Sequence, residues 1–386
     1  MWALLAIAAL ALILYAILRG ATYSNDFKSP YRVARVFWET GVLDIKSEPR
    51  YPPTVRVLMA PLAALPIANA AAVWAGLSAA ALALTPGLLA RLSGVPVRAQ
   101  GLAWLAVLVF VIDAIVLGQS DPVNLALVTG GLVLARRTWP AFGVVLIGVA
   151  AMLKVLPAIF GVVIAALGRV RGTVAGALLA SLIAIGLLST AGPRAGAASM
   201  VEWYQGLRDA EGPWGLVETR NSLRENNESL AVVLARTVGD LEPGLARNAV
   251  SLARLPLRAV WGIWLAVLGA MAIAWTVCAW RSRSEPSGRD WLAMFALTAG
   301  ILLAATPIAW PHYFIWLLPG TLYLSDRRRL LLAIAGGGAL GMVVAPLRGL
   351  GCHALLSLVV FAVVTRDHLR GRAGGRRRDG ELPNSA

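Results

Sequence analysis

The chain has 386 residues, of which 58% are hydrophobic and only 14% are charged, and its formal net charge is +15. Soluble globular domains carry about 25% charged residues, so this composition excludes an ordinary soluble protein. Apolar runs recur along the chain at about 20 residues, the length that a helix needs to cross a bilayer. Most of the excess arginine lies at the ends of these runs, which suits anionic headgroups better than nucleic acid. The sequence therefore predicts an all-α polytopic membrane protein.

Twelve membrane spans are predicted. The segment 2–18 lacks a basic start and a cleavage site, so it is interpreted as a retained helix and not as a signal peptide. The three spans between 121 and 168 are short for a bilayer of about 30 Å. Two of them, 139–153 and 155–168, are alternatively a re-entrant pair of half-helices. In chain order the predicted spans are 2–18, 68–90, 100–117, 121–136, 139–153, 155–168, 172–190, 257–280, 290–305, 311–324, 329–346 and 350–365.

The arginine residues also predict the orientation. One set of short connections and the C-terminal tail are rich in arginine, and the positive-inside rule assigns them to the cytoplasm. Two long polar segments, 19–67 and 191–256, then lie on the outer face, and both termini are cytoplasmic. We expect a multi-pass protein of the plasma (inner) membrane with one domain, 1–366, and a disordered basic tail, 367–386. The connections of the cytoplasmic set carry Arg91, Arg98, Arg136, Arg137, Arg169, Arg171, Arg281, Arg283, Arg289, Arg327, Arg328 and Arg329.

The first outer segment contains a short predicted helix, SPYRVARVFWETG. Ser29 is expected to cap this helix, Pro30 suits its first turn, and Gly41 can end it. Aromatic side chains fall on one face and arginines on the other, which favours a position in the membrane interface. The prolines of residues 50–66 then predict a rigid return to the membrane. Asp26 would lie at headgroup height, between the first span and the interfacial helix.

Several short motifs follow one another in order between residues 20 and 325. An acidic residue in the first outer loop precedes a tyrosine-containing helix, and then come YPPTVRVLMAPLAALP, GQSDPVNLALVTGGLVLARR, LKVLP, NNESLAVVLAR and TPIAWPHYFIWLLP. In this order the motifs resemble the polyprenol-phosphate-mannose-dependent mannosyltransferases of glycosyltransferase family 87, within the GT-C superfamily. The resemblance implies a GT-C-type helical bundle that takes a sugar from a polyprenyl-phosphate donor on the outer face. It also implies that Asp26 is the catalytic base.

The chemistry of the residues points the same way. A hydroxyl group that attacks an anomeric carbon needs a base, and a carboxylate such as Asp26 can take its proton. The leaving lipid phosphate needs cations or N–H donors to stabilise its growing charge. One carboxylate favours inversion, because retention in the glycosidase mechanism uses a second carboxylate as nucleophile. We therefore expect transfer of a hexose, with mannose favoured, to a hydroxyl of a lipid or glycan acceptor.

Two residues are candidates for contact with the donor. His312, in the sequence WPHYF, matches the family's histidine, although Pro311 stands where an acidic residue is frequent in the family. It is expected either to contact the donor phosphate or the reacting sugar, or to belong to an interfacial aromatic belt. Lys154 either binds the donor phosphate or extends to the interface. Of the nearby carboxylates, Asp121 is expected to cap a helix, and Asp113 lies inside a span and needs a partner.

Further candidates are polar or aromatic residues of the outer connections. Gln119 is expected to hydrogen-bond sugar or phosphate, and Tyr51 to stack on sugar or to belong to the aromatic belt. Asn226, Asn227 and Glu228 are expected to contact acceptor or donor, but the sequence ENNES is also an ordinary helix start.

No motif with metal-ligand spacing appears, so neither a metal nor another cofactor is expected. Membrane lipids are the expected surroundings, and nucleic acid is not an expected partner. Two rival functions remain. A transporter or flippase of lipid-linked sugars would place functional charges near the midplane and on both faces. For a non-catalytic membrane assembly factor, Asp26 would be dispensable.

Overall fold

The computed structural model describes residues 25–48, 51–211, 226–241 and 252–378, together with Tyr15, Leu18 and Arg19. Within these residues the regular secondary structure is helical, apart from one isolated bridge between Gly239 and Leu255. The predicted all-α class is therefore confirmed. Most of the predicted span 2–18 and the end of the basic tail lie outside the described residues.

The described residues form helices of very different lengths. In order, they are α2 (Asn25–Thr40), α3 (Thr54–Ala63), α4 (Ile67–Ser93), η1 (Val97–Ala99), α5 (Gly101–Leu117), α6 (Asp121–Arg137), α7 (Pro140–Leu153), η2 (Leu156–Phe160), α8 (Gly161–Ile164), η3 (Ala165–Arg169), α9 (Val170–Ser189), α10 (Pro193–Glu211), α11 (Leu230–Val238), α12 (Leu257–Ser282), α13 (Gly288–Ala305), η5 (Pro311–Leu317), α14 (Leu318–Tyr323), α15 (Arg328–Val343), α16 (Ala345–Gly349) and α17 (Cys352–Arg378).

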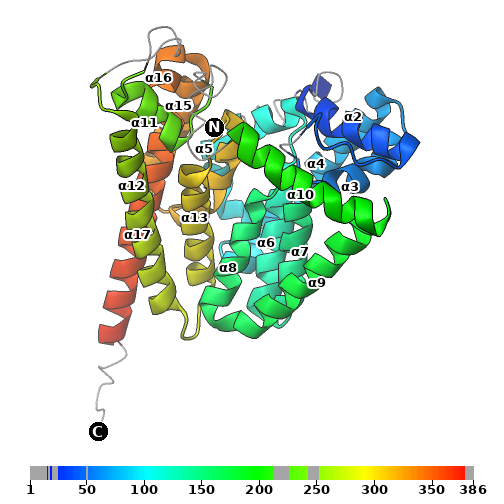
Figure 1. Cartoon of the computed structure of the whole chain (residues 1–386). Coiled ribbons are helices and arrows are strands. Elements are labelled where there is room, and N and C mark those ends of the chain that lie inside the picture. Colours follow the sequence, from blue (N-terminus) through cyan, green and yellow to red (C-terminus); the bar gives the residue numbers. More distant parts are fainter. Residues whose placement is uncertain are drawn as a thin grey trace.

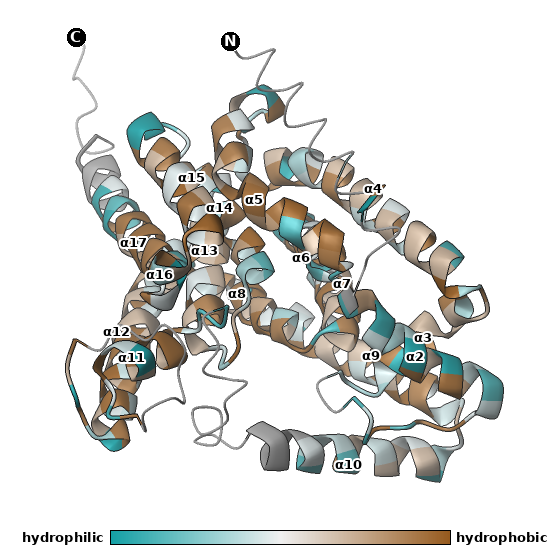
Figure 2. Cartoon of the chain, turned by 90° about the horizontal axis from the view of Figure 1, so that it is seen from above, coloured by the Kyte–Doolittle hydropathy of each residue, from teal (hydrophilic) through white to brown (hydrophobic). Residues whose placement is uncertain are grey.

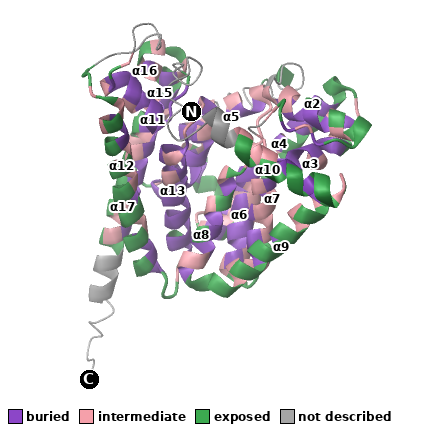
Figure 3. Ribbon diagram, viewed as in Figure 1, coloured by how far each residue is buried: buried purple, intermediate pink, exposed green. Residues whose placement is uncertain are grey.

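The helices form a bundle, with α12, α13 and α17 on one side of Figure 1 and α6, α7 and α9 on the other. Burial is concentrated in central helices such as α6 and α13, whereas few residues of α9 and α12 are buried (Figure 3). Apolar residues cover the long helices, while hydrophilic residues are frequent on α2 and α10 (Figure 2). Apolar side chains exposed along whole helices indicate surfaces that face lipid.

Five helical stretches of the described chain are long and apolar enough to cross a membrane. The pair α5 and α6, bent by 118° at its break, makes a sixth if it counts as one broken span. The predicted number of twelve is therefore not confirmed, because several predicted spans correspond to helices that are too short. One of the five stretches also contains a break at Leu167 and Gly168, whose backbone angles are not helical. The five stretches are Ile67–Ser93, Leu156–Ser189, Leu257–Ser282, Gly288–Ala305 and Cys352–Gly371.

Two glycines bring α6 and α7 into close contact. A Cβ atom added at Gly131 would lie only 2.5 Å from the carbonyl oxygen of Gly143, and one added at Gly143 would clash with the Gly131 carbonyl in the same way. Small residues allow such an approach between helices in a membrane. As a result, the beginning of α6 and the end of α7 lie side by side.

The arginine-rich connections gather at one end of the bundle. The Nη1 atom of Arg136, at the end of α6, donates to the carbonyl oxygens of Arg91 at 2.8 Å and Leu92 at 2.7 Å. Arg327 forms an ion pair of 2.6 Å with Asp367. These contacts join connections that were predicted to share the cytoplasmic face. The assignment of this face to the cytoplasm stays a prediction.

The helix predicted in the first outer segment exists, but it begins earlier than expected, and its interfacial position stays a prediction. α2 starts at Asn25, so Pro30 lies inside the helix. The prediction that Ser29 caps the helix is wrong, because its hydroxyl group donates to the carboxylate of Glu48. Gly41, with a φ of 71°, ends the helix as predicted. The earlier start places Asp26 in the first helical turn instead of in a loop.

Candidate active site

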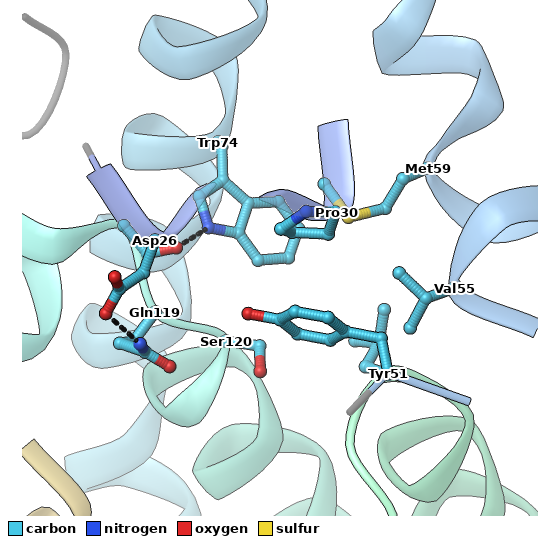
Figure 4. A pocket seen from close by; sticks show the side chains of 10 residues that line it. Asp26, Pro30, Tyr51, Val55, Met59, Trp74, Gln119 and Ser120 are labelled. Carbon is cyan, nitrogen blue, oxygen red and sulfur yellow. Dashed lines mark hydrogen bonds between the residues drawn. The ribbon is translucent and has the colours of Figure 1, made fainter. Parts of the chain in front are cut away.

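A pocket lies where α2, α4 and the break between α5 and α6 meet (Figure 4). Its empty space, including the part open to solvent, is about 320 Å³. Carboxylate, amide and hydroxyl groups lie toward one end, and Pro30, Val55 and Met59 toward the other. The pocket can thus receive a molecule with a polar and an apolar part. The lining residues are Asp26, Pro30, Tyr51, Val55, Met59, Trp74, Gly118, Gln119, Ser120 and Leu153.

Asp26 and Gln119 come together at the polar end of this pocket. The Nε2 atom of Gln119 donates a hydrogen bond of 2.6 Å to Oδ2 of Asp26, across 93 residues of sequence. Gln119 can reach Asp26 because α5 ends at Gly118, which adopts a φ of 71° that a residue with a side chain rarely adopts. Two predicted site residues are therefore in direct contact.

Trp74, which was not among the predicted site residues, supports this turn. Its Nε1 atom donates to the carbonyl oxygen of Gly118 at 2.9 Å. The ring of Phe27 stacks on the indole with a centroid distance of 6.0 Å. Since Phe27 follows Asp26 in α2, this stacking also places the carboxylate. A lone tryptophan among alanines, in the sequence IANAAAVWAG, was the available signal.

Arg56 holds the connection that carries Tyr51. Its side chain is fully buried and donates to the carbonyl oxygens of Asp44 at 2.7 Å, Glu48 at 3.1 Å and Tyr51 at 3.2 Å. Burial lowers the pKa of Arg56 to about 10, so the guanidinium group remains charged at neutral pH. The planar group with five donors suits this set of acceptors.

Tyr51 presents its ring and hydroxyl group to the pocket (Figure 4). Burial raises the pKa of Tyr51 well above its ordinary value of about 10, and the negative charges of Asp26, Glu48 and Asp121 raise it further. The hydroxyl group therefore stays protonated at neutral pH and can donate a hydrogen bond to a ligand.

Lys154 and Asp121 form a second polar group beside the pocket. The Nζ atom of Lys154, which follows α7, donates to Oδ2 of Asp121 at 2.8 Å, and Nε1 of Trp316 donates to Oδ1 at 3.0 Å. Nζ also lies 3.7 Å from the centroid of the Tyr313 ring. The prediction that Asp121 caps a helix is wrong, because both of its oxygens bind other elements. The group adjoins the pocket through Leu153, which lines it.

The charge of Lys154 follows from the same contacts. Burial alone would lower the pKa of Lys154, but the negative charge of Asp121 and the contact with Tyr313 outweigh burial and leave the pKa raised. The ammonium group therefore remains charged at neutral pH.

His312 lies in η5, next to Tyr313. Its side chain is buried, its Nδ1 atom is 3.5 Å from Oδ2 of Asp113 in α5, and neither ring nitrogen forms a hydrogen bond in the described part of the chain. His312 is thus the partner that the predicted intramembrane carboxylate needed. It does not line the pocket that Asp26 lines, but Tyr313 connects it to Lys154.

Asn226 and Glu228 are not among the residues that line this pocket. Asn226 is exposed, and its Oδ1 atom accepts a hydrogen bond of 3.3 Å from Arg348. Glu228 is fully buried and contacts His353. The predicted helix start is confirmed, because Ser229 caps α11 by accepting a hydrogen bond from the backbone N–H of Val232. The substrate-binding roles of Asn226 and Glu228 stay predictions.

Among the residues that the structure describes, no group of three or more His, Cys, Asp or Glu side chains could hold a metal ion. Both cysteines, Cys278 and Cys352, are free thiols.

The fold is that of an all-α polytopic membrane protein, and its pocket contains the carboxylate of Asp26 beside the break between α5 and α6. Comparison with protein families matches residues 50–307, more than half of the chain, to the family described as glycosyltransferase family 87. The chain therefore belongs to glycosyltransferase family 87, which is of GT-C type, and it is a membrane glycosyltransferase. Asp26 and His312 lie outside the matched range. Comparisons with curated proteins and with solved structures gave no match.

Proposed function

We propose that the protein transfers a hexose, with mannose favoured, from a polyprenyl-phosphate sugar to a hydroxyl of a lipid or glycan acceptor. The transfer inverts the anomeric carbon, and Asp26 is the general base. The observation that carries this proposal is the contact of Asp26 with Gln119 inside a pocket that is polar at one end and apolar at the other.

The two oxygens of Asp26 have different surroundings. Oδ2 accepts the hydrogen bond from Gln119, whereas Oδ1 forms none within the described residues. A hydrogen bond to one oxygen fixes the orientation of the carboxylate and leaves the other oxygen able to accept a proton. A general base needs to lie within hydrogen-bond reach of the proton that it takes, and an acceptor hydroxyl group next to Oδ1 would meet that condition.

Lys154 and His312 are the proposed contacts of the donor phosphate. An ammonium group has three N–H donors, so Lys154 can hold Asp121 and a phosphate oxygen together. The buried ring nitrogens of His312 leave it able to bind a further polar group. Positive charge and N–H donors stabilise the negative charge that grows on the leaving phosphate.

The lipid-linked donor and the outer face are proposed together. The pocket and Lys154 lie at the helix ends opposite the arginine-rich connections, and the positive-inside rule assigns those connections to the cytoplasm. A nucleotide sugar made in the cytoplasm would be on the wrong side. A polyprenyl-phosphate sugar can reach an outer pocket while its tail stays in lipid, with its first isoprenoid units near Val55 and Met59.

The decisive experiment uses purified, reconstituted enzyme with polyprenyl-phosphate mannose and, separately, GDP-mannose. We expect labelling of a lipid acceptor from the lipid-linked donor only, and its loss by about 10³-fold or more in Asp26→Asn. Gel filtration and thermal unfolding of the variant serve as the folding control. Near-normal turnover by Asp26→Asn would refute the base, and transfer from GDP-mannose alone would refute the donor class. Transbilayer movement of a lipid-linked sugar without transfer would favour the flippase.

A further inference from the structure

The NNES sequence, residues 226–229, binds the turn that precedes His312. The backbone N–H of Glu228 donates to the carbonyl oxygen of Ala309 at 2.7 Å. In return, the backbone N–H of Ala309 donates to Oδ1 of Asn227 at 3.0 Å, and Nδ2 of Asn227 donates to the carbonyl oxygen of Pro307 at 3.4 Å. A turn without helical hydrogen bonds of its own is thus bound by two residues that are distant in sequence.

The carboxylate of Glu228 is directed away from this turn, toward His353 at the start of α17. Oε2 accepts the backbone N–H of His353 at 2.9 Å, and Oε1 lies 2.6 Å from its Nδ1 atom. Nε2 of His353 lies 3.0 Å from the carbonyl oxygen of Gly338 in α15. Both side chains have no exposed surface. A buried carboxylate of this kind is costly unless its hydrogen bonds are satisfied, and here they are.

The hydrogen-bond partners fix the number of protons that this pair holds. The carbonyl of Gly338 only accepts, so Nε2 of His353 carries a proton. One more proton lies between Nδ1 and Oε1, either on the imidazole or on the carboxyl group. The pair is therefore neutral as a whole. A glutamine at position 228 could make the same contacts, with its oxygen toward the backbone N–H of His353 and its amide N–H toward Nδ1.

The pair also supports the helix that carries His312. The ring of His353 packs edge-on against Phe110 at 4.9 Å and lies 5.3 Å from Phe314, both measured between ring centroids. Phe110 is one turn before Asp113 in α5, and Phe314 is two residues after His312 in η5. The contact between His312 and Asp113 is thus built directly on the side chains that His353 touches.

We propose that Glu228 is a positioning residue that holds His312 in place through His353 and the 306–310 turn, and that it does not bind substrate. This inference rests on the proposed function, in which His312 contacts the donor. It replaces the predicted substrate contact of Glu228 with a structural role, on the basis of the contacts of Glu228 with His353.

Glutamine and alanine at position 228 test the proposal against a substrate-binding carboxylate. A positioning role needs the shape and the hydrogen bonds, so Glu228→Gln should keep kcat within about two-fold of wild type. Glu228→Ala leaves buried donors of His353 unpaired and should lower kcat by about ten-fold or more, with a much smaller change in the donor KM. A carboxylate that acts on substrate would instead make both variants equally defective.

Hydrogen–deuterium exchange provides a readout that does not depend on activity. In Glu228→Ala, peptides that cover residues 306–317 should exchange faster, because residue 228 is no longer anchored to His353 and the neighbouring Asn227, which accepts from the N–H of Ala309, is held less firmly. In Glu228→Gln they should exchange as in wild type. Thr85→Ala removes a buried hydroxyl group in α4 and is the matched control for a general loss of stability. Glu228→Asp keeps the carboxylate but is one methylene shorter and cannot make both contacts with His353, and it replaces Glu228→Ala if that variant does not fold.

The outcomes separate this proposal from the proposed function. Wild-type exchange at 306–317 in Glu228→Ala, or in Glu228→Asp if that variant replaces it, would overturn the positioning role, as would equal loss of kcat in Glu228→Gln and Glu228→Ala with unchanged exchange. If the wild-type enzyme does not use a polyprenyl-phosphate sugar, the proposed function fails. The exchange data still decide whether Glu228 holds the turn.

Discussion

Lys154 and Asp121 form an ion pair of 2.8 Å in which the side chains are only 14% and 2% exposed. The pair joins the end of α7 to the start of α6, and Trp316 extends it to η5. The same ammonium group is our candidate for the donor phosphate. In the proposed function, Lys154 therefore contributes to both stability and donor binding, and mutation can separate the two contributions.

The first prediction uses a double mutant of this pair. Either Lys154→Gln or Asp121→Asn should lower the free energy of unfolding by about 3 kcal/mol, because each leaves one buried charge without its partner. The double variant should recover most of this loss, since two neutral amides replace two charges. Its donor KM should nevertheless stay raised by about ten-fold or more, because the phosphate has lost its cation. Denaturant unfolding and steady-state kinetics measure the two effects. A wild-type donor KM in the double variant would exclude Lys154 as a phosphate ligand.

The second prediction concerns the buried guanidinium group of Arg56. Arg56→Lys keeps the charge but cannot reach the carbonyl oxygens of Asp44, Glu48 and Tyr51 together. Loss of two such hydrogen bonds should lower the free energy of unfolding by about 2–4 kcal/mol. Trypsin should then cut faster after Lys46, whose side chain is 87% exposed in the same connection.

Arg98→Lys, in an exposed connection, is the matched control for this experiment. It should change neither stability nor the rate of cleavage after Lys46. Equal stability of wild type and Arg56→Lys would show that Arg56 does not organise the connection.

The third prediction concerns pH. The raised pKa of Tyr51 means that the folded protein keeps the phenol proton at pH values where an unfolded chain releases it. The free energy of unfolding should therefore fall as the pH rises above about 10, by up to about 1.4 kcal/mol per pH unit from this residue. Tyr51→Phe should show a shallower decrease above pH 10 and should run parallel to wild type between pH 7 and 9. Identical slopes above pH 10 would contradict the raised pKa.

The fourth prediction tests which side of the membrane the pocket faces. In a background without Cys278 and Cys352, Lys46→Cys should react with a membrane-impermeant thiol reagent added to intact cells, because Lys46 lies in the connection that ends at Tyr51. Arg328→Cys, exposed at the arginine-rich end, should react only after the membrane is opened. The reverse pattern would place the pocket in the cytoplasm.

The composition and the length of the apolar runs were sufficient to predict an all-α membrane protein, because both are local properties that do not depend on tertiary contacts. The number of spans was not predictable in this way. Helices such as α7 pack against other helices, here α6 and α9, and need not match the thickness of a bilayer. The non-helical backbone at Leu167 and Gly168 interrupts a continuous apolar run. Local apolar content carries no information on such tertiary packing.

The candidate site shows a similar division. Order along the chain and residue chemistry singled out Asp26, Gln119 and Tyr51, and the structure brings all three to one pocket. The roles of Asp121 and Trp74 depend on partners that are distant in sequence. Asp121 accepts a hydrogen bond from Trp316, and Trp74 donates one to the carbonyl oxygen of Gly118. A helix-cap pattern looks the same whether the carboxylate binds its own backbone or another helix, so sequence could not separate the two.

The contact between Gly131 and Gly143 has a consequence for mutagenesis screens. Gly131 is ten residues from Asp121 and Gly143 is eleven from Lys154, about 15 Å along each helix axis. A methyl group at either glycine would force α6 and α7 apart. Because the helices are rigid, this displacement would also separate Asp121 from Lys154 at the other ends of the two helices. A random mutagenesis screen for loss of sugar transfer should therefore recover alanine and serine at these two positions. Neither glycine lines the pocket, so the pocket residues alone would not predict this effect.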